Sequence, residues 1–137
     1  DGQPRTDVVS GKPVVLELAY DVLQEAVGFH VYFELRDPEG LMLFESLHNG
    51  DESGIPRTPA GRYRSRATIP ADFLAPMTYE LCFDAGLHGL RHCIPKPIRI
   101  PLTVSALGRV NRAYPGYRTP GRLAPLIEWN TDHEELR

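Results

Sequence analysis

Residues 29–36 read FHVYFELR, and this alternation of apolar and polar side chains decides the fold class. In a β-strand successive side chains point to opposite faces, so period-two alternation predicts a strand with one face on a core. The following DPEG at residues 37–40 is typical of a turn, because proline presets φ and glycine accepts positive φ. The apolar run at residues 41–47 therefore predicts the second strand of a hairpin.

The same alternation recurs along the chain. We expect strands over residues 14–20, 62–69, 78–84 and 97–104, separated by proline- and glycine-rich stretches. Residues 70–76 predict a single helical turn, and no long segment shows a helical period. Short strands with regular turns predict an all-β fold, an immunoglobulin-like antiparallel β-sandwich. The expected inward side chains are Val14, Leu16, Leu18, Tyr20, Phe29, Val31, Phe33, Leu35, Tyr63, Ser65, Ala67, Ile69, Tyr79, Leu81, Phe83, Ile98, Ile100, Leu102 and Val104.

Two prolines fall in the last of these strands. Pro97 and Pro101 both remove backbone donors from the same lateral side of the strand. We therefore predict that residues 97–104 form an edge strand or lie beside a bulge.

Composition and motifs narrow the function classes. The 137 residues suit one domain, and a net charge of −3 gives no basic field for nucleic acid. A phosphate loop, a GxSxG elbow and an HExxH helix are all absent from the sequence. His88, His92 and Cys93 could supply three zinc ligands, but they lack a second cluster, so we favour a polar hairpin tip. We predict no enzyme activity, no metal and no cofactor.

The hairpin tip itself has two alternatives. With a two-residue loop at Leu87 and His88, Asp84 would face Arg91, and Cys82 would face Cys93 closely enough to oxidise. Leucine and histidine are poor residues for the positive φ that such a turn needs. The other alternative is a wider, irregular loop.

Polar side chains gather on the expected outer face of three neighbouring strands. In an immunoglobulin-like order, residues 29–35, 78–84 and 97–104 lie side by side. An aromatic ring among hydrogen-bonding groups suits a sugar, whose CH groups stack while its hydroxyls bond; the alternative is an ordinary solvated face. The candidate carbohydrate-binding residues are His30, Tyr32, Glu34, Glu80, Asp84 and Arg99.

A stripe of arginines lies on a different expected strand. Arg62, Arg64 and Arg66 could form an anion-binding surface. We favour pairing with Glu17 and Asp21, because the two strands are neighbours in an immunoglobulin-like sheet.

Residues 105–125 form an arm that is too long for an ordinary loop. The arm contains arginines and tyrosines but no acid, and it leads to the apolar run Leu126-Ile127-Glu128-Trp129. We expect a terminal strand there, which either returns to its own sheet or crosses to a second subunit. We divide the chain into a leader or linker at 1–12, the sandwich at 13–130 and a solvated tail at 131–137.

From about Val14 to Trp129 the chain resembles the C-terminal domain of the nucleotide-binding subunit of O-antigen polysaccharide ABC exporters, the Wzt type. Met77 departs from the glycine common in that family, which changes a turn but not the strand. The residues that carry the resemblance are Tyr20, Gly28-Phe29, Asp37-Pro38-Glu39-Gly40, Leu43-Phe44, Pro59 to Tyr63, Ile69-Pro70, Phe73-Leu74, Tyr79 to Leu81 and Gly121 to Trp129.

The resemblance implies a non-catalytic domain that recognises the non-reducing end of a lipid-linked polysaccharide during lipopolysaccharide biosynthesis. It implies an ATPase domain elsewhere in the full protein, a membrane exporter subunit as partner, and a cytoplasmic place at the inner membrane. It also implies a homodimer with an exchanged last strand, which would put Leu126, Ile127 and Trp129 at the interface. The alternative is an immunoglobulin-like dimerisation or protein-interaction module without sugar binding.

Overall fold

A computed structural model describes residues 7–9, 11–89, 91–105 and 110–136, with only the backbone described at 7–9, 91 and 92. The described residues form β-strands and turns and contain no helix, and so none that could cross a membrane. The strands are β1 (Asp7–Val9), β2 (Val14–Val22), β3 (Ala26–Val27), β4 (Phe29–Arg36), β5 (Met42–Leu47), β6 (Arg57–Thr58), β7 (Gly61–Ile69), β8 (Thr78–Leu87), β9 (Arg91–His92) and β10 (Ile98–Ser105).

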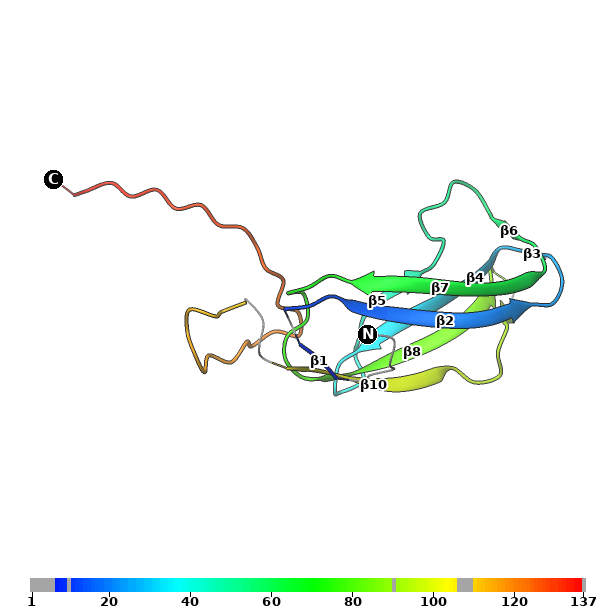
Figure 1. Ribbon diagram of the computed structural model, residues 1–137, viewed down its shortest axis with the longest axis horizontal. Coiled ribbons are helices and arrows are strands. Elements are labelled where there is room, and N and C mark those ends of the chain that lie inside the picture. Colours follow the sequence, from blue (N-terminus) through cyan, green and yellow to red (C-terminus); the bar gives the residue numbers. More distant parts are fainter. Residues whose placement is uncertain (1–6, 10, 90, 106–109, 137) are drawn as a thin grey trace.

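The strands form two facing layers, which confirms the predicted β-sandwich (Figure 1). The larger sheet has the order β1-β10-β8-β4-β5, with β9 on β8, and β2 pairs with β7 in the opposite layer. These neighbours follow the immunoglobulin pattern, in which strand B pairs with strand E in one sheet and strands C, F and G form the other. Here β2 and β7 correspond to B and E, and β4, β8 and β10 correspond to C, F and G. All these pairs are antiparallel except β1 with β10. β1 lies within the range predicted as a leader or linker, so part of that range joins the sheet.

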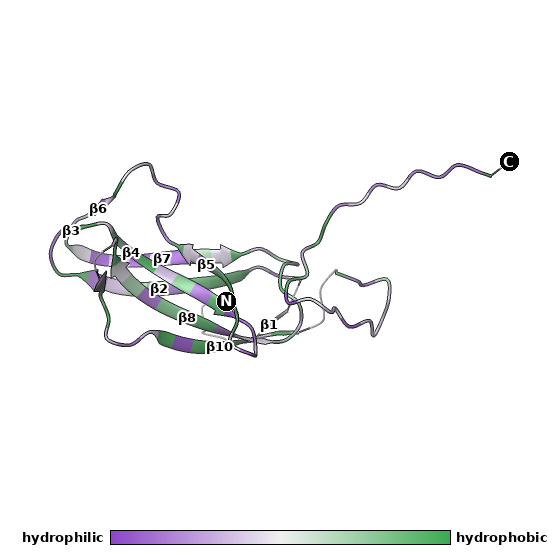
Figure 2. Ribbon diagram, turned by 180° about the vertical axis from the view of Figure 1, so that it is seen from behind, coloured by the Kyte–Doolittle hydropathy of each residue, from purple (hydrophilic) through white to green (hydrophobic). Residues whose placement is uncertain are grey.

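The core lies between the layers, where the predicted alternation places it. Hydrophobic and hydrophilic bands alternate along β8 and β10 in Figure 2. Leu35 is completely buried, and truncating such a side chain to alanine costs about 2–5 kcal/mol. One cluster of buried side chains contains Val14, Leu16, Phe33, Leu35, Ile69, Leu74, Tyr79, Leu81, Phe83, Leu102 and Val104.

Tyr79 fixes the corner that leads into β8. Its side chain is 1% exposed, and its hydroxyl donates towards the carbonyl oxygens of Ala75, at 2.5 Å, and Arg122, at 2.6 Å. A tyrosine that bonds to backbone just upstream of this strand is a recurrent feature of immunoglobulin-like sandwiches. Here the same hydroxyl also holds the segment that follows β10.

The predicted helical turn over residues 70–76 is wrong. Ala124 N donates to Phe73 O at 2.7 Å, Leu126 N donates to Asp72 O at 2.8 Å, and Leu74 pairs with Leu123 in an antiparallel bridge. The carbonyl groups that a helical turn would use internally are therefore occupied by residues 122–126. Asp72 adopts a left-handed conformation with φ of 56°, which also interrupts a helix.

β10 is an edge strand only along its first half. It pairs with β8 from Ile98 to Thr103, whereas β1 reaches it only from Thr103 to Ser105. The prediction from Pro97 and Pro101 is thus confirmed for the first half. Ile98 was expected inward but is 56% exposed, because it lies at the end of this edge where β8 is its only neighbour.

Candidate functional site

The predicted outer face is assembled as expected, because β10, β8 and β4 are adjacent in the large sheet. Tyr32 is opposite Asp84, while Glu34 and Arg99 are both opposite Cys82, on either side of β8. A groove of about 350 Å³ lies over this part of the sheet. That volume is at the lower end of the range for ligand sites. Four of the predicted residues line the groove, namely Tyr32, Glu34, Asp84 and Arg99.

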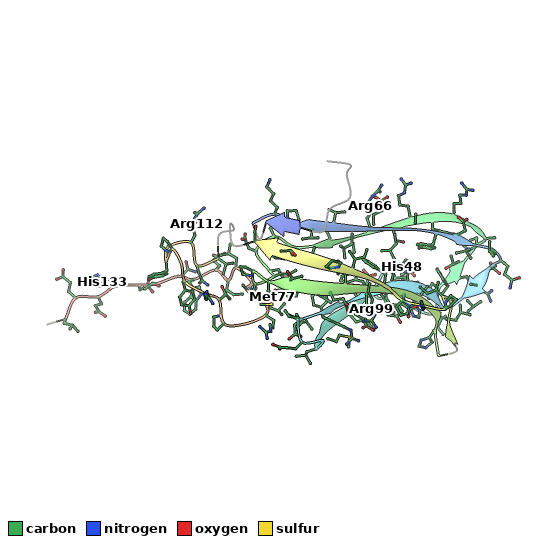
Figure 3. All side chains as sticks on the ribbon, turned by 90° about the horizontal axis from the view of Figure 1, so that it is seen from below. His48, Arg66, Met77, Arg99, Arg112 and His133 are labelled. Carbon is green, nitrogen blue, oxygen red and sulfur yellow. The ribbon has the colours of Figure 1, made fainter. Side chains whose placement is uncertain are left out.

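One wall of the groove comes from the connection between β9 and β10. Ile94, Pro95 and Pro97 line it with apolar surface. Cys82 also lines the groove and, although it is on the outer face, only 5% of it is exposed. Burial raises the pKa of the Cys82 thiol, and so does its contact with Glu80 at 3.5 Å, so the thiol is protonated and unreactive. Figure 3 shows Arg99 on the large sheet, where the groove lies, and Arg66 on the opposite layer, formed by β2 and β7.

Tyr32 contributes a ring and a hydroxyl to the groove. The hydroxyl donates to Asp84 Oδ2 at 3.2 Å, and the Ala85 N–H donates to Asp84 Oδ1 at 2.8 Å. Burial and the nearby Asp84 carboxylate raise the pKa of Tyr32 to about 12. The phenol therefore stays protonated at physiological pH and remains a hydrogen-bond donor.

Two arginine–carboxylate pairs border the groove. Arg36 donates to Glu34 Oε2 through Nη2 at 2.6 Å and through Nε at 3.2 Å, and its Nη1 donates to Gly40 O at 2.9 Å. Arg99 Nη1 donates to Glu80 Oε1 at 2.8 Å. Arg36 was not among the predicted site residues, yet the alternation of residues 29–36 already places it on this face with Tyr32 and Glu34.

Two predicted residues flank the groove without lining it. Glu80 accepts a hydrogen bond from Arg99, which itself lines the groove. His30 Nδ1 lies 3.2 Å from Gly28 O, and its ring centroid is 5.6 Å from that of Tyr32. The structure thus brings Tyr32, Glu34, Asp84 and Arg99 together and leaves His30 and Glu80 at the border.

The hairpin tip adopts the wider loop. Leu87 is opposite Arg91 and Gly86 is opposite His92, so the predicted register, with Cys82 opposite Cys93 and Asp84 opposite Arg91, is wrong. The side chain of Arg91 lies outside the described part of the chain, so an ion pair between Asp84 and Arg91 stays a prediction. Cys93 N donates instead to Ala85 O at 2.8 Å. Both cysteines are free, and Gly89 supplies the positive φ, 68°, that the loop requires.

No group of three histidine, cysteine, aspartate or glutamate side chains able to hold a metal occurs in the described part of the chain. The side chain of His92, one of the three considered zinc ligands, lies outside that part.

The arginine stripe is paired, as we favoured. Arg64 and Arg66 contact Glu17 at 3.1 and 3.0 Å, and Arg62 contacts Asp21 at 3.7 Å. A hollow of about 500 Å³ lies beside these pairs and is lined by residues of the paired strands β2 and β7. It is larger than the groove, but the tyrosine rings that line it stack on each other at 5.7 Å. Their hydroxyls also bond within the protein, to Ser65 at 2.7 Å and to Pro59 at 2.6 Å.

The predicted terminal strand does not return to its own sheet. Residues 127–136 extend away from the sandwich (Figures 1 and 2). Ile127 and Trp129 are 62% and 84% exposed, and Leu126 is the last described residue that donates a backbone hydrogen bond. The predicted exchange of this segment between subunits stays a prediction.

Comparison with known proteins supports the fold. The chain is similar to a solved structure described as the C-terminal domain of wzt, with a TM-score of 0.62 over 93% of this chain and 74% of that chain. Sequence identity is 13%, so the likeness concerns the fold. Neither a scan against protein-family models nor a search of curated proteins found a match. The predicted structural resemblance to the Wzt domain is thereby confirmed.

Proposed function

We propose that this chain is a non-catalytic domain that recognises the non-reducing end of a lipid-linked O-antigen-type polysaccharide for export by an ABC transporter. The observation that carries the proposal is the groove on the outer face of β4, β8 and β10. Its lining combines the Tyr32 ring, an apolar wall and hydrogen-bonding groups that include Glu34 and Arg99. The similarity in fold to the C-terminal domain of wzt supports the same function.

Each part of the groove has a distinct role in this proposal. The Tyr32 ring and the wall of Ile94, Pro95 and Pro97 meet the CH groups of a sugar. Arg99 donates to sugar oxygens, and Glu34 accepts from sugar hydroxyls. These groups are held in place by contacts within the protein, so little ordering is needed on binding. The size of the groove fits the end of a chain better than a long internal stretch.

The wider context follows from the same proposal. The ATPase activity would reside in another domain of the full protein, and this domain would lie in the cytoplasm at the inner membrane, beside the exporter. A homodimer would present two grooves. Micromolar to millimolar affinity corresponds to about 4 to 8 kcal/mol per site, and two linked sites gain from effective concentration. The division into a domain up to residue 130 and a tail at 131–137 is part of the proposal, with β1 included in the domain because it pairs with β10.

Calorimetric or NMR titration tests this function. The ligand is the polysaccharide of the source strain, with an unrelated polysaccharide beside it. We expect saturable binding to the native glycan alone, and Tyr32→Ala should weaken it by about 5-fold to 150-fold, because a stacked ring contributes about 1–3 kcal/mol. Arg64→Gln, on the opposite layer, is the matched control and should bind normally. A folded protein that does not bind at millimolar ligand would overturn the proposal.

One observation favours the alternative, a dimerisation or protein-interaction module. The exposed run at Leu126, Ile127 and Trp129 is apolar and projects from the sandwich. This alternative predicts a dimer in light scattering that does not bind glycan. The proposed function predicts a dimer that does bind glycan.

A further inference from the structure

Residues 110–119 form the tip of the arm, and backbone hydrogen bonds hold this tip in two consecutive turns. Tyr114 N donates to Asn111 O at 3.0 Å, and Tyr117 N donates to Tyr114 O at 3.1 Å. Asn111 adopts a left-handed conformation with φ of 58°, and its side-chain Nδ2 donates to Thr119 Oγ1 at 3.1 Å. The arm tip therefore has a defined shape before a partner arrives, which lowers the entropic cost of binding one.

The arm tip exposes the residue types that contribute most to protein–protein binding. Tyr114 and Tyr117 are 72% and 59% exposed, and Arg112 and Arg118 are exposed as well. Residues 110–119 contain no acidic residue, and within the described part of the chain no ion pair reaches either arginine. Tyrosine and arginine are enriched among the residues that dominate binding at protein interfaces. The arm tip is thus a positively charged surface with two aromatic rings.

The terminal segment, residues 127–136, has the complementary character. It begins with the apolar side chains of Ile127 and Trp129 and continues with Asp132, Glu134 and Glu135, and it contains no lysine or arginine. All of its residues are exposed. Among the described residues, no hydrogen bond or ion pair joins it to the arm tip of its own chain.

Both segments leave the sandwich at the same end, opposite to β3 and β6 (Figure 1). Figure 3 shows Arg112 and His133 beyond the strands at this end. If a two-fold axis passes close to this end, each contact between the arm tip of one copy and the terminal segment of the other occurs twice. A chain that carries both a surface and its complement at one end meets the requirement of such an interface.

We propose that the terminal segment of one copy docks on the arm tip of a second copy. Trp129 packs against the two tyrosine rings of the partner's arm tip, and the acidic end of the segment, residues 132–135, lies beside the two arginines. This inference rests on the homodimer of the proposed function and is independent of glycan binding. It adds the surface that receives the segment. In the monomer both arginines stay unpaired and Trp129 stays exposed.

Length and chemistry both suit this arrangement. Ten residues in an extended conformation span about 33 Å, so the segment is long enough to reach a neighbouring copy. Aromatic rings that pack on each other supply affinity through buried apolar area. The opposite charges fix the orientation of the segment and make the contact sensitive to salt.

A pair of charge-swapped chains tests the inference. The arm variant carries Arg112→Glu and Arg118→Glu, and the tail variant carries Asp132→Lys, Glu134→Lys and Glu135→Lys. In either variant alone, the arm tip and the terminal segment have charges of the same sign, so we expect a dimer at least tenfold weaker than that of the wild type. An equimolar mixture should form a heterodimer close to wild-type affinity, because both of its contacts join opposite charges. Light scattering and Trp129 emission over a concentration series measure the association.

Arg57→Glu with Arg62→Glu is the matched control, because it changes the net charge as much as the arm variant does. Both residues are exposed and lie on β6 and at the start of β7, at the other end of the sandwich, so this control should dimerise like the wild type. Thermal unfolding checks that each variant is folded.

Three results would contradict the docking. If the charge-swapped mixture stays monomeric while the wild type dimerises, or if the control weakens the dimer as much as the arm variant does, the docking is wrong and the homodimer stands. A wild type that is monomeric at every concentration would overturn the docking and the homodimer together. Titration of the arm variant with a short oligosaccharide of the native glycan separates these failures from that of glycan binding, because the groove lies on other strands.

Discussion

Arg122 and Asp37 are 85 residues apart in the sequence, yet Arg122 Nε donates to Asp37 Oδ2 at 3.2 Å. Asp37 Oδ1 accepts from the N–H groups of Glu39 and Leu41, both at 2.9 Å. The carboxylate thus holds the β4–β5 turn and, through Arg122, the segment that follows β10. Arg122 O in turn accepts from Tyr79 and Ala75, so one residue joins the arm to the β4–β5 turn and to the start of β8, which lie at the same end of the sandwich.

Arg122→Gln should loosen the arm without unfolding the sandwich. The variant loses the ion pairs to Asp37 and Glu39, and Asp37 keeps its backbone donors. We expect a melting temperature lower by a few degrees and faster hydrogen exchange at residues 122–126. Arg118→Gln is the control, because the described structure gives Arg118 no ion pair. Equal melting temperatures in the two variants would show that the Arg122 contacts contribute nothing.

The Asp37 carboxylate should make stability depend on pH in acid. Burial raises the pKa of Asp37, but the Leu41 and Glu39 N–H groups and Arg122 outweigh burial, so the pKa lies below its ordinary value. A lowered folded-state pKa contributes stability that is present above the ordinary carboxyl pKa of about 3.9 and is lost as the pH falls through the folded value. The free energy of unfolding of the wild type should therefore exceed that of Asp37→Asn at pH 7, and the difference should shrink below about pH 4. Urea unfolding at several pH values measures it, and a constant difference would contradict the expectation.

Tyr79→Phe should destabilise the domain by about 1–3 kcal/mol, because it leaves the buried Ala75 carbonyl without its hydroxyl donor, whereas Arg122 O keeps the Ala75 N–H. Tyr63→Phe is the matched control. It also removes a hydroxyl that donates to a carbonyl, Pro59 O, but at an exposed position where water can replace the bond. Urea unfolding of both variants checks the difference. Equal losses would mean that burial of the Tyr79 bonds adds nothing.

The sequence predicts those parts of the fold that depend on side-chain alternation. The core faces of β2, β4, β7 and β8 follow directly from period two, and so does the outer face with Tyr32, Glu34, Asp84 and Arg99. The same alternation of residues 29–36 also places Arg36 on this outer face, so the sequence predicts Arg36 as a site residue as well.

Other parts depend on backbone contacts that no pattern reveals. The pairing of residues 72–75 with 122–126 is made by main-chain groups, which every residue type possesses apart from the missing N–H of proline. The wall of Ile94, Pro95 and Pro97 and the burial of Cys82 depend on the path of a loop. The exposure of Ile98 could not be predicted from alternation either, because it depends on which strands reach that end of β10.

Residues 127–136 should decide the oligomeric state, and Trp129 reports on it because it is the only tryptophan. In a single chain its side chain is 84% exposed, so a monomer should show the emission maximum of a solvated indole. If the segment is exchanged between subunits, raising the protein concentration should shift the emission to the blue and double the mass in light scattering, since the ring is buried in the dimer.

A chain truncated after Leu126 should remain a folded monomer, because Leu126 is the last described residue that donates a backbone hydrogen bond to the sandwich. Its melting temperature at low concentration should match that of the full chain. Solvated emission and a monomeric mass for the full chain at every concentration would contradict the exchange. The exposed apolar run would then have to meet a different partner, because Ile127 and Trp129 contact little of their own sandwich.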